Sequence, residues 1–186
     1  MNHLVFLLEE PSAQDLLEGF LPRLLPATIY RYYFVFDGKQ DLEAQLVRKL
    51  RGWRKPDSAF VVLRDQDAAD CRKVKRGLAD LVAQSGRAPS LVRIACRELE
   101  SWIVGDWWAI AKAFERPELA AQGLKEAHRT PDDLVRPVDT IRRFVPEYQK
   151  RDGARRIGPL LDPERNQSES FRAFCAGVKA LAARAP

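Results

Sequence analysis

The sequence predicts an α/β fold, with a mostly parallel sheet flanked by helices and an α-helical C-terminal extension. Two observations support this prediction. In the first half of the chain, short apolar runs alternate with amphipathic segments of helical length, which is typical of parallel strands joined by helical crossovers. From Glu98 onward the strand-like runs stop, and helical and loop patterns follow. We expect an α/β core over residues 1–105 and a helical extension over 106–186, packed as one compact unit.

Four segments have the composition of strands. LVFLL (4–8) is a continuous apolar run, as in a strand covered on both faces. TIYRYYFVF (28–36) is β-branched and aromatic, and AFVVL (59–63) and SLVRIAC (90–96) are also strand-like. We therefore predict parallel strands near residues 3–9, 28–36, 59–64 and 91–96.

The segments between these strands show helical spacing. Ser12 and Asp15 are three residues apart and resemble a capping box for the first helix. Gly86 is expected to end the third helix. The apolar face of the second helix carries Leu42, Leu46 and Leu50.

The second half is predicted to be helical on both sides of a break at Gly105, with Asp106 as the cap of the second piece. Three tryptophans at helical spacing are typical of a core: Trp102, Trp107 and Trp108. The last helix carries an apolar stripe of Phe171, Phe174, Cys175, Val178 and Leu181.

The composition bounds the function classes. The chain has 186 residues, 46% of them hydrophobic, which is enough for a globular core. No apolar run approaches the ~20 residues of a membrane span, and the first ten residues lack the features of an export signal. Three widely spaced cysteines suit reduced thiols in the cytoplasm, and only two histidines argue against structural zinc. A net charge of +5 is compatible with nucleic-acid binding without establishing it.

Acidic residues follow three of the predicted strands: Glu9, Glu10, Asp65, Asp67, Glu98 and Glu100. Because ligands bind at the carboxyl ends of parallel strands, we expect these carboxylates to meet at one edge of the sheet. Clustered like charges require a neutralising cation, either a protein cation such as Arg64 or Arg97 or a divalent metal. Oxygen ligands without histidine suit Mg²⁺.

The acids after the third predicted strand have a structural alternative as caps of the third helix: Asp65, Asp67 and Asp70. This interpretation is strongest for Asp70. Glu98 and Glu100 also fit the first turn of the next helix. Glu9 is harder to explain structurally, because it ends an apolar strand and precedes a helix with its own predicted cap.

The order of a strand-terminal Glu and a later D-x-D resembles the Toprim domain of topoisomerases, primases and overcoming-lysogenisation-defect nucleases. LLEEPSAQDLL stands where these domains have an apolar strand, a Glu, usually a Gly, and a helix; here Glu10 replaces the glycine. The whole chain also resembles a bacterial family known as domain of unknown function 4276. The matching stretches are DGKQDLEAQLVRKLRGWR, VVLRDQDAADC, LVRIACRELESWIVGD, YQKRDGARRIGPLL and NQSESFRAF.

This resemblance implies a Toprim-like nuclease that uses Mg²⁺, with Mn²⁺ as a substitute. By position, it implies catalytic and metal-binding roles for Glu9, Asp65 and Asp67. Glu98 and Glu100 would hold a second metal or support the first. Family members often occur beside AAA-type ATPases in phage-defence cassettes, so the resemblance also implies an ATPase partner that restrains or triggers the protein.

Two basic segments are candidates for nucleic-acid binding. VRKLRGWRK (47–55) surrounds Trp53 with cations, as in a phosphate-tracking patch with a stacking residue, or as in a solvated helix end. YQKRDGARRIG (148–158) places cations around Gly153, although a charge run is usually a solvated face. The candidate residues are Lys49, Arg51, Arg54, Lys150, Arg155 and Arg156.

Three functions fit these features. The first is a Mg²⁺-dependent phosphodiesterase acting on DNA or RNA, as an effector of a defence system. The second is a non-catalytic Toprim-like module that docks on an AAA-type ATPase or a polyanion. The third is a phosphatase of the haloacid-dehalogenase type, which normally has Thr or Val where this chain has Ala69.

Overall fold

The computed structural model describes residues 2–183 and contains one sheet of four parallel strands in the order β2-β1-β3-β4. The strands are β1 (His3–Leu8), β2 (Tyr30–Val35), β3 (Ser58–Asp65) and β4 (Ser90–Ala95). Each lies within two residues of its predicted position. The predicted α/β class is therefore confirmed.

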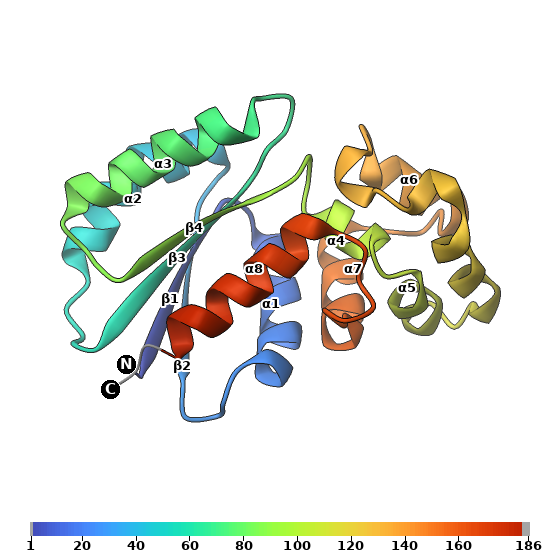
Figure 1. Cartoon of the computed structure of the whole chain (residues 1–186), viewed down its shortest axis with the longest axis horizontal. Coiled ribbons are helices and arrows are strands. Elements are labelled where there is room, and N and C mark those ends of the chain that lie inside the picture. The colour runs from blue at the N-terminus through green and yellow to red at the C-terminus, as the bar shows by residue number, and fades with distance from the viewer. Residues whose placement is uncertain (1, 184–186) are drawn as a thin grey trace.

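Four long helices cover the two faces of the sheet (Figure 1). They are α1 (Pro11–Leu24), α2 (Lys39–Gly52), α3 (Cys71–Ser85) and α8 (Glu169–Ala182). Helices α1 and α8 lie on one face, and α2 and α3 lie on the other. The last helix of the chain thus covers the same face as the first.

The central strand β1 is buried on both sides. Leu4, Phe6 and Leu8 belong to the core shared with α1 and α8. Val5 and Leu7 belong to the core shared with α2 and α3. Successive side chains of a strand point to opposite faces, so a strand between two helical layers requires a continuous apolar run.

The rest of the extension consists of short helices beside the sheet (Figure 1). They are α4 (Glu100–Val104), α5 (Trp107–Ala113), η1 (Pro117–Leu124), η2 (Glu126–His128), η3 (Pro131–Asp133), α6 (Pro137–Phe144), α7 (Lys150–Ile157) and η4 (Gly158–Leu160). Both α7 and η4 pack against α1. Their approach is so close that a Cβ on Gly158 would lie 2.5 Å from the Leu16 carbonyl oxygen.

Several predicted helix ends are confirmed. Asp70 caps α3 by accepting a hydrogen bond from the Lys73 amide, and Asp106 caps α5 by accepting from the Ala109 amide. Gly86 ends α3 in the left-handed conformation. No helix within residues 2–183 is both long and apolar enough to cross a bilayer.

The predicted capping box at Ser12 and Asp15 is wrong. Helix α1 begins at Pro11, so Ser12 lies inside the first turn and its hydroxyl donates to the Glu10 carboxylate. Asp15 instead accepts hydrogen bonds from Arg151 and Arg155 of α7. The acid that resembled a local cap joins two helices that are far apart in the sequence.

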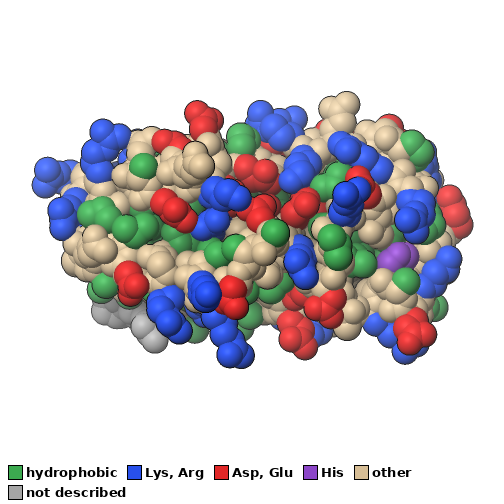
Figure 2. Space-filling view, turned by 90° about the horizontal axis from the view of Figure 1, so that it is seen from above, with side chains coloured by type: hydrophobic (Ala, Val, Ile, Leu, Met, Phe, Trp, Pro, Cys, Tyr) green, Lys and Arg blue, Asp and Glu red, His purple; other side chains and the backbone are tan. Residues whose placement is uncertain are grey.

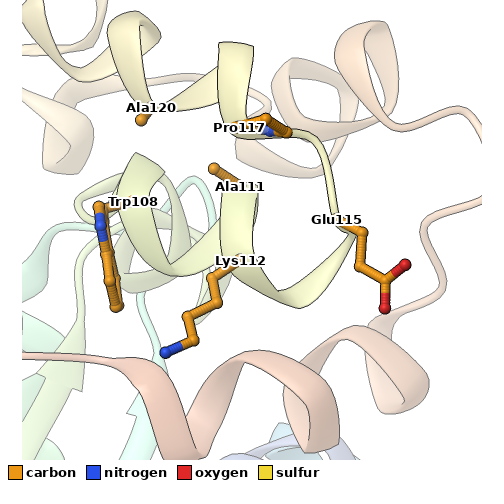
Figure 3. Close-up of a pocket in the computed structure, with 6 residues that line it drawn as sticks. All are labelled: Trp108, Ala111, Lys112, Glu115, Pro117 and Ala120. Carbon is orange, nitrogen blue, oxygen red and sulfur yellow. The ribbon is translucent and has the colours of Figure 1, made fainter.

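The prediction that Trp108 belongs to the core is also wrong. Its side chain is 43% exposed, whereas Trp102 and Trp107 are buried. Neighbouring residues of a helix point about 100° apart, so Trp107 and Trp108 cannot face the same core. Trp108 instead borders a hollow of about 540 Å³, where Lys112 lies over its ring (Figure 3).

Candidate functional site

Glu9 and Asp65 meet at the carboxyl edge of the sheet. The strands β1 and β3 are neighbours, and Glu9 continues β1 by donating its amide to the Leu63 carbonyl. The Glu9 Oε2 atom accepts a hydrogen bond of 3.0 Å from the Asp65 amide. The first acid and the first Asp of the D-x-D sequence are therefore held together by the backbone of β3.

The loops that follow β3 and β4 are tied to each other. The Asp67 amide donates to the Arg97 carbonyl at 2.8 Å, and the Arg97 amide donates to the Gln66 side chain. Asp67 and Arg97 both have left-handed backbones, with φ of 56° and 62°. Residues without glycine's freedom rarely adopt this conformation, and such strain clusters at functional sites.

Three acids surround one lysine beside Asp65. The Lys150 ammonium group, at the start of α7, lies 3.8 Å from Glu10, 3.6 Å from Glu98 and 3.3 Å from Glu100. In Figure 2, which views the molecule from above Figure 1, acidic and basic side chains lie side by side in the middle of the visible surface. We use the name acidic edge for Glu9, Glu10, Asp65, Glu98 and Glu100 together with Lys150.

Glu100 is almost fully buried, with 1% of its surface exposed. Its Oε1 atom accepts a hydrogen bond of 3.4 Å from the Tyr148 hydroxyl. Its Oε2 atom is close to Lys150 but has no hydrogen bond among the described residues. A buried carboxylate oxygen without a donor is costly, so this oxygen is suited to receiving a cation or a protonated ligand.

Burial and mutual repulsion shift the ionisation of the acidic edge. Burial, reinforced by Glu10, Glu100 and Glu9, raises the pKa of Asp65 well above its usual value. Burial also raises the pKa of Glu100 to about 7, although Lys150 opposes this shift. The pKa of Glu9 is raised by burial against the hydrogen bond from the Asp65 amide. These carboxylates bind protons more tightly than ordinary acids do.

Lys150 responds in the opposite sense. Burial lowers the pKa of its ammonium group, but the nearby carboxylates outweigh burial and raise this pKa above its ordinary value. The strongest of these carboxylates is Glu100. Lys150 therefore stays charged and neutralises part of the acidic edge.

Asp67 lies at the outer side of this group. Its carboxylate pairs with the Lys39 ammonium at 2.8 Å, and both side chains are less than half exposed to solvent, at 39% for Asp67 and 48% for Lys39. A hollow of about 210 Å³ beside it is lined by Asp67, Ala68, Arg97, Glu98 and Val135. Asp67 is thus accessible to a ligand that approaches the acidic edge from solvent.

The two cations expected from the sequence contribute less than Lys150. The Arg64 Nε atom lies 3.8 Å from Glu9 Oε2, while its NH1 atom bonds Glu43 at 2.5 Å. Arg97 forms no ion pair within residues 2–183. The main neutralising residue is one that the sequence placed among nucleic-acid contacts.

The acidic edge fits a hard cation by its chemistry, because its carboxylates offer only oxygen ligands and one Glu100 oxygen accepts no hydrogen bond among the described residues. Within residues 2–183, however, no three His, Cys, Asp or Glu side chains are already arranged as a metal site. Mg²⁺ usually takes one or two carboxylates and completes its shell with water and substrate phosphate. Glu9, Asp65 and Glu100 are the residues that would hold it, with Asp67 and Glu98 nearby.

The other predicted nucleic-acid contacts are dispersed. Helix α2 begins beside Glu9, at the carboxyl ends of the strands, and ends near Ser58, where β3 starts. Arg51 and Arg54 therefore lie toward the amino ends of the strands. Lys49 lies over the Phe34 ring, and Arg51 donates to the Gln84 carbonyl. These residues do not adjoin the acidic edge.

The arginines of α7 make internal contacts. Arg155 donates to Asp15 at 3.1 Å, and Arg156 donates to the Ala113 carbonyl at 2.8 Å. Arg156 also lies over the Phe114 ring. Both side chains keep about half their surface exposed, so their predicted contact with phosphate remains a prediction.

The sequence reasoning missed one residue at the acidic edge and a basic segment that lies outside it. Tyr148 was not singled out, although its hydroxyl bonds Glu100. Exposed cations also follow the D-x-D loop on the first turns of α3, at Arg72, Lys73, Lys75 and Arg76. The run CRKVKR directly after the acids was the available signal, but it was interpreted only as a helix.

The fold and the acidic edge define a class: parallel α/β proteins whose carboxylates converge at the carboxyl ends of neighbouring strands. The chain belongs to the family described as Domain of unknown function (DUF4276), whose model matches residues 8–179. The family predicted from the sequence is thus confirmed. No curated protein and no solved structure shows significant similarity to the chain.

Proposed function

We propose that the protein is a Mg²⁺-dependent nuclease that hydrolyses phosphodiester bonds of DNA or RNA, with Mn²⁺ as a substitute. The observation that carries this proposal is the meeting of Glu9 and Asp65 beside the buried Glu100 oxygen, which pairs with Lys150 but accepts no hydrogen bond among the described residues. A cluster of carboxylates with raised pKa values at strand ends is typical of a functional site.

Several residues of the acidic edge and of the loops beside it have roles in this proposal. Bound Mg²⁺ supplies positive charge that polarises the scissile phosphate and lowers the pKa of an attacking water. Glu9, Asp65 and Glu100 hold the ion, and the partly exposed Asp67 reaches it from the solvent side. Glu9 has one oxygen fixed by the Asp65 amide, which leaves Oε1 to accept a proton from the water. Arg97 is free to contact a phosphate oxygen.

We further propose that the protein acts in the cytoplasm with an AAA-type ATPase, as an effector of a phage-defence system. This part rests on the family resemblance alone. In the isolated chain, Lys150 already neutralises part of the acidic edge. We therefore expect the isolated chain to be weakly active until the partner triggers it.

A second candidate is a non-catalytic module that docks on an ATPase or a polyanion. Two observations favour it: Lys150 already neutralises the acids, and no three potential ligands within residues 2–183 form a ready metal site. In this case the acidic edge is a structural remnant of a catalytic fold, and metal has no effect on the protein.

Metal dependence separates the two candidates. Purified protein is incubated with plasmid, single-stranded DNA and tRNA in Mg²⁺, Mn²⁺ or chelator, and metal binding is measured by calorimetry. The nuclease proposal expects metal binding even if the isolated chain cleaves slowly. Absence of both binding and cleavage would support the docking module.

Variants of the acids sharpen this experiment. Glu9→Gln, Asp65→Asn and Asp67→Asn are expected to abolish metal binding and cleavage while keeping the fold. Asp65→Asn is expected to raise the melting temperature in chelator, because it removes one of several repelling charges. The matched control is Asp70→Asn, which keeps the cap of α3 and is expected to keep metal binding. Metal binding that survives all three substitutions would overturn the assignment.

A further inference from the structure

The strand β4 forms an edge of the sheet, and one of its sides has no neighbouring strand. The carbonyls of Pro89 and Ala95 accept hydrogen bonds from β3, at the two ends of β4. Backbone groups alternate in direction along a parallel strand, so those of Ser90, Val92 and Ile94 point away from β3. The Val92 carbonyl accepts a hydrogen bond of 3.1 Å from the Arg93 side chain. The other outward groups have no strand partner within residues 2–183, and such an edge is a template for a further strand.

A hollow of about 560 Å³ runs along this edge, between β4 and α3. On the α3 side its walls are formed by Ala79, Val82 and Ala83, and on the strand side by Leu91 and Val92. The alanines are exposed, so their small side chains leave room beside the strand. We call this hollow the β4 groove.

The rim of the β4 groove is basic. Lys75, Arg87 and Arg93 line it, and no acidic residue does. Arg87 donates only to backbone carbonyls at the end of α2, and Arg93 donates to the carbonyls of Ala173 and Val92. Among the described residues none of the three forms an ion pair, so no acidic side chain neutralises their charge.

We propose that the β4 groove binds an extended, acidic segment of a partner protein, which adds a fifth strand next to β4. The outward backbone groups of β4 pair with the segment, and its alternate side chains enter the apolar hollow. Its acidic side chains complement Lys75, Arg87 and Arg93. This site lies outside the acidic edge and does not depend on nuclease activity.

A second copy of the chain is a poorer occupant. Pairing two β4 edges across a two-fold axis would place each copy's basic rim against the same rim of its partner. Like charges across an interface oppose association. The charge pattern therefore selects an acidic partner of different sequence.

The test uses fluorescein-labelled octapeptides and fluorescence anisotropy on the full chain. One peptide alternates Glu and Val, and a matched peptide alternates Lys and Val. The Glu–Val peptide is expected to bind saturably and to weaken with salt, whereas the Lys–Val peptide is expected not to bind. Equal binding of both peptides, or no saturable binding of either, would overturn the proposal.

Backbone pairing has its own readout. In an extended peptide, alternate amides point to opposite sides and form two sets. Two further Glu–Val peptides are used, and each carries N-methyl groups on one of these sets. Methylation of the set that faces β4 is expected to abolish binding, and methylation of the other set is expected to preserve it. Amide exchange of Val92 and Ile94 is expected to slow when the unmodified peptide binds. Unchanged exchange at both amides would exclude strand addition.

Charge variants locate the site. Lys75→Glu is expected to weaken binding of the Glu–Val peptide by roughly tenfold or less, as for the reversal of one exposed charge. The matched control is Lys73→Glu, an exposed lysine of the same helix that does not line the groove, and it is expected to bind like the unsubstituted chain. Equal effects of both variants would show attraction to the whole helix and would contradict a defined groove. Sedimentation that shows a dimer of the unsubstituted chain, which the Glu–Val peptide dissociates, would also overturn the proposal, in favour of a second copy.

Discussion

Glu100 is the least exposed carboxylate of the acidic edge, and its pKa of about 7 lies well above its ordinary value of 4.5. Burial raises this pKa, and Glu10 and Glu98 add to it against Lys150. The folded state therefore binds this proton more tightly than the unfolded state does. Its contribution to stability is complete below about pH 4.5 and is lost as the pH rises through about 7.

Glu100→Gln is expected to change this pH dependence. Glutamine resembles the protonated acid, so the variant should match the unsubstituted chain near pH 4 and exceed its stability above pH 7. The difference should be on the order of 3 kcal/mol, from a pKa shift between 4.5 and about 7. Urea unfolding in chelator at several pH values measures it. Parallel pH profiles for the two proteins would contradict the buried, coupled position of Glu100.

Lys150→Met is expected to have the opposite effect. Removing the cation leaves the buried carboxylates without their partner, which should cost on the order of 2 kcal/mol, less than for a fully buried pair because Lys150 is partly exposed. Mg²⁺ should restore part of this stability, since it can take over the neutralising charge. Melting curves with and without Mg²⁺ measure the recovery.

The control for this substitution is Lys112→Met, which removes an exposed lysine over Trp108. It should have little effect on stability and none on the response to metal. If Mg²⁺ stabilised Lys150→Met no more than Lys112→Met, the acidic edge would not be a cation site.

At the scale of elements, α7 connects the C-terminal extension to α1 and to the acidic edge. Its residues Arg151 and Arg155 bind Asp15 of α1, and its first residue, Lys150, enters the acidic edge. Gly153 faces the Tyr148 ring so closely that a Cβ would lie 2.1 Å from a ring carbon. The position of Tyr148 against Glu100 thus depends on a glycine one turn into α7.

Gly153→Ala is expected to destabilise the protein, because neither the buried ring nor the packed helix has room for a methyl group. The cost should be about 1–3 kcal/mol, as for other overpacked sites. Gly77→Ala in α3 is the matched control, because a Cβ there meets nothing within 4 Å. It should stabilise the protein by about 0.5–1 kcal/mol through helix propensity. Thermal unfolding of both variants tests this contrast, and equal signs would refute it.

For the whole molecule, the sheet depends on the end of the chain. Phe171 and Phe174 of α8 belong to the same core as Leu4 and Phe6 of β1. A chain that stops at residue 105 would expose this face of the sheet to water. We expect such a fragment to be unfolded or aggregated, as measured by circular dichroism and sedimentation. A soluble fragment with cooperative unfolding would show instead that residues 1–105 are an independent domain.

The sequence predicted the sheet well, because its signals are local. Each strand is an apolar run bounded by turn residues, and each strand-terminal acid sits next to its own strand. The order of the strands then brought Glu9 and Asp65 together. The role of Lys150 could not be predicted in this way, because it depends on how α7 packs against α1. The prediction that Trp108 belongs to the core was wrong for a related reason, since helical spacing alone does not say which of two adjacent tryptophans faces the core.

The acids and the lysine of the acidic edge leave the ribosome at different times. Lys150 follows Glu100 by 50 residues, a delay of about 3–10 s at a synthesis rate of roughly 5–20 residues per second. In that interval the nascent chain carries the carboxylates without their cation. Helix α8, which covers one face of the sheet, is made later still. The acidic edge can therefore assemble only after α7 has been made and has packed against α1.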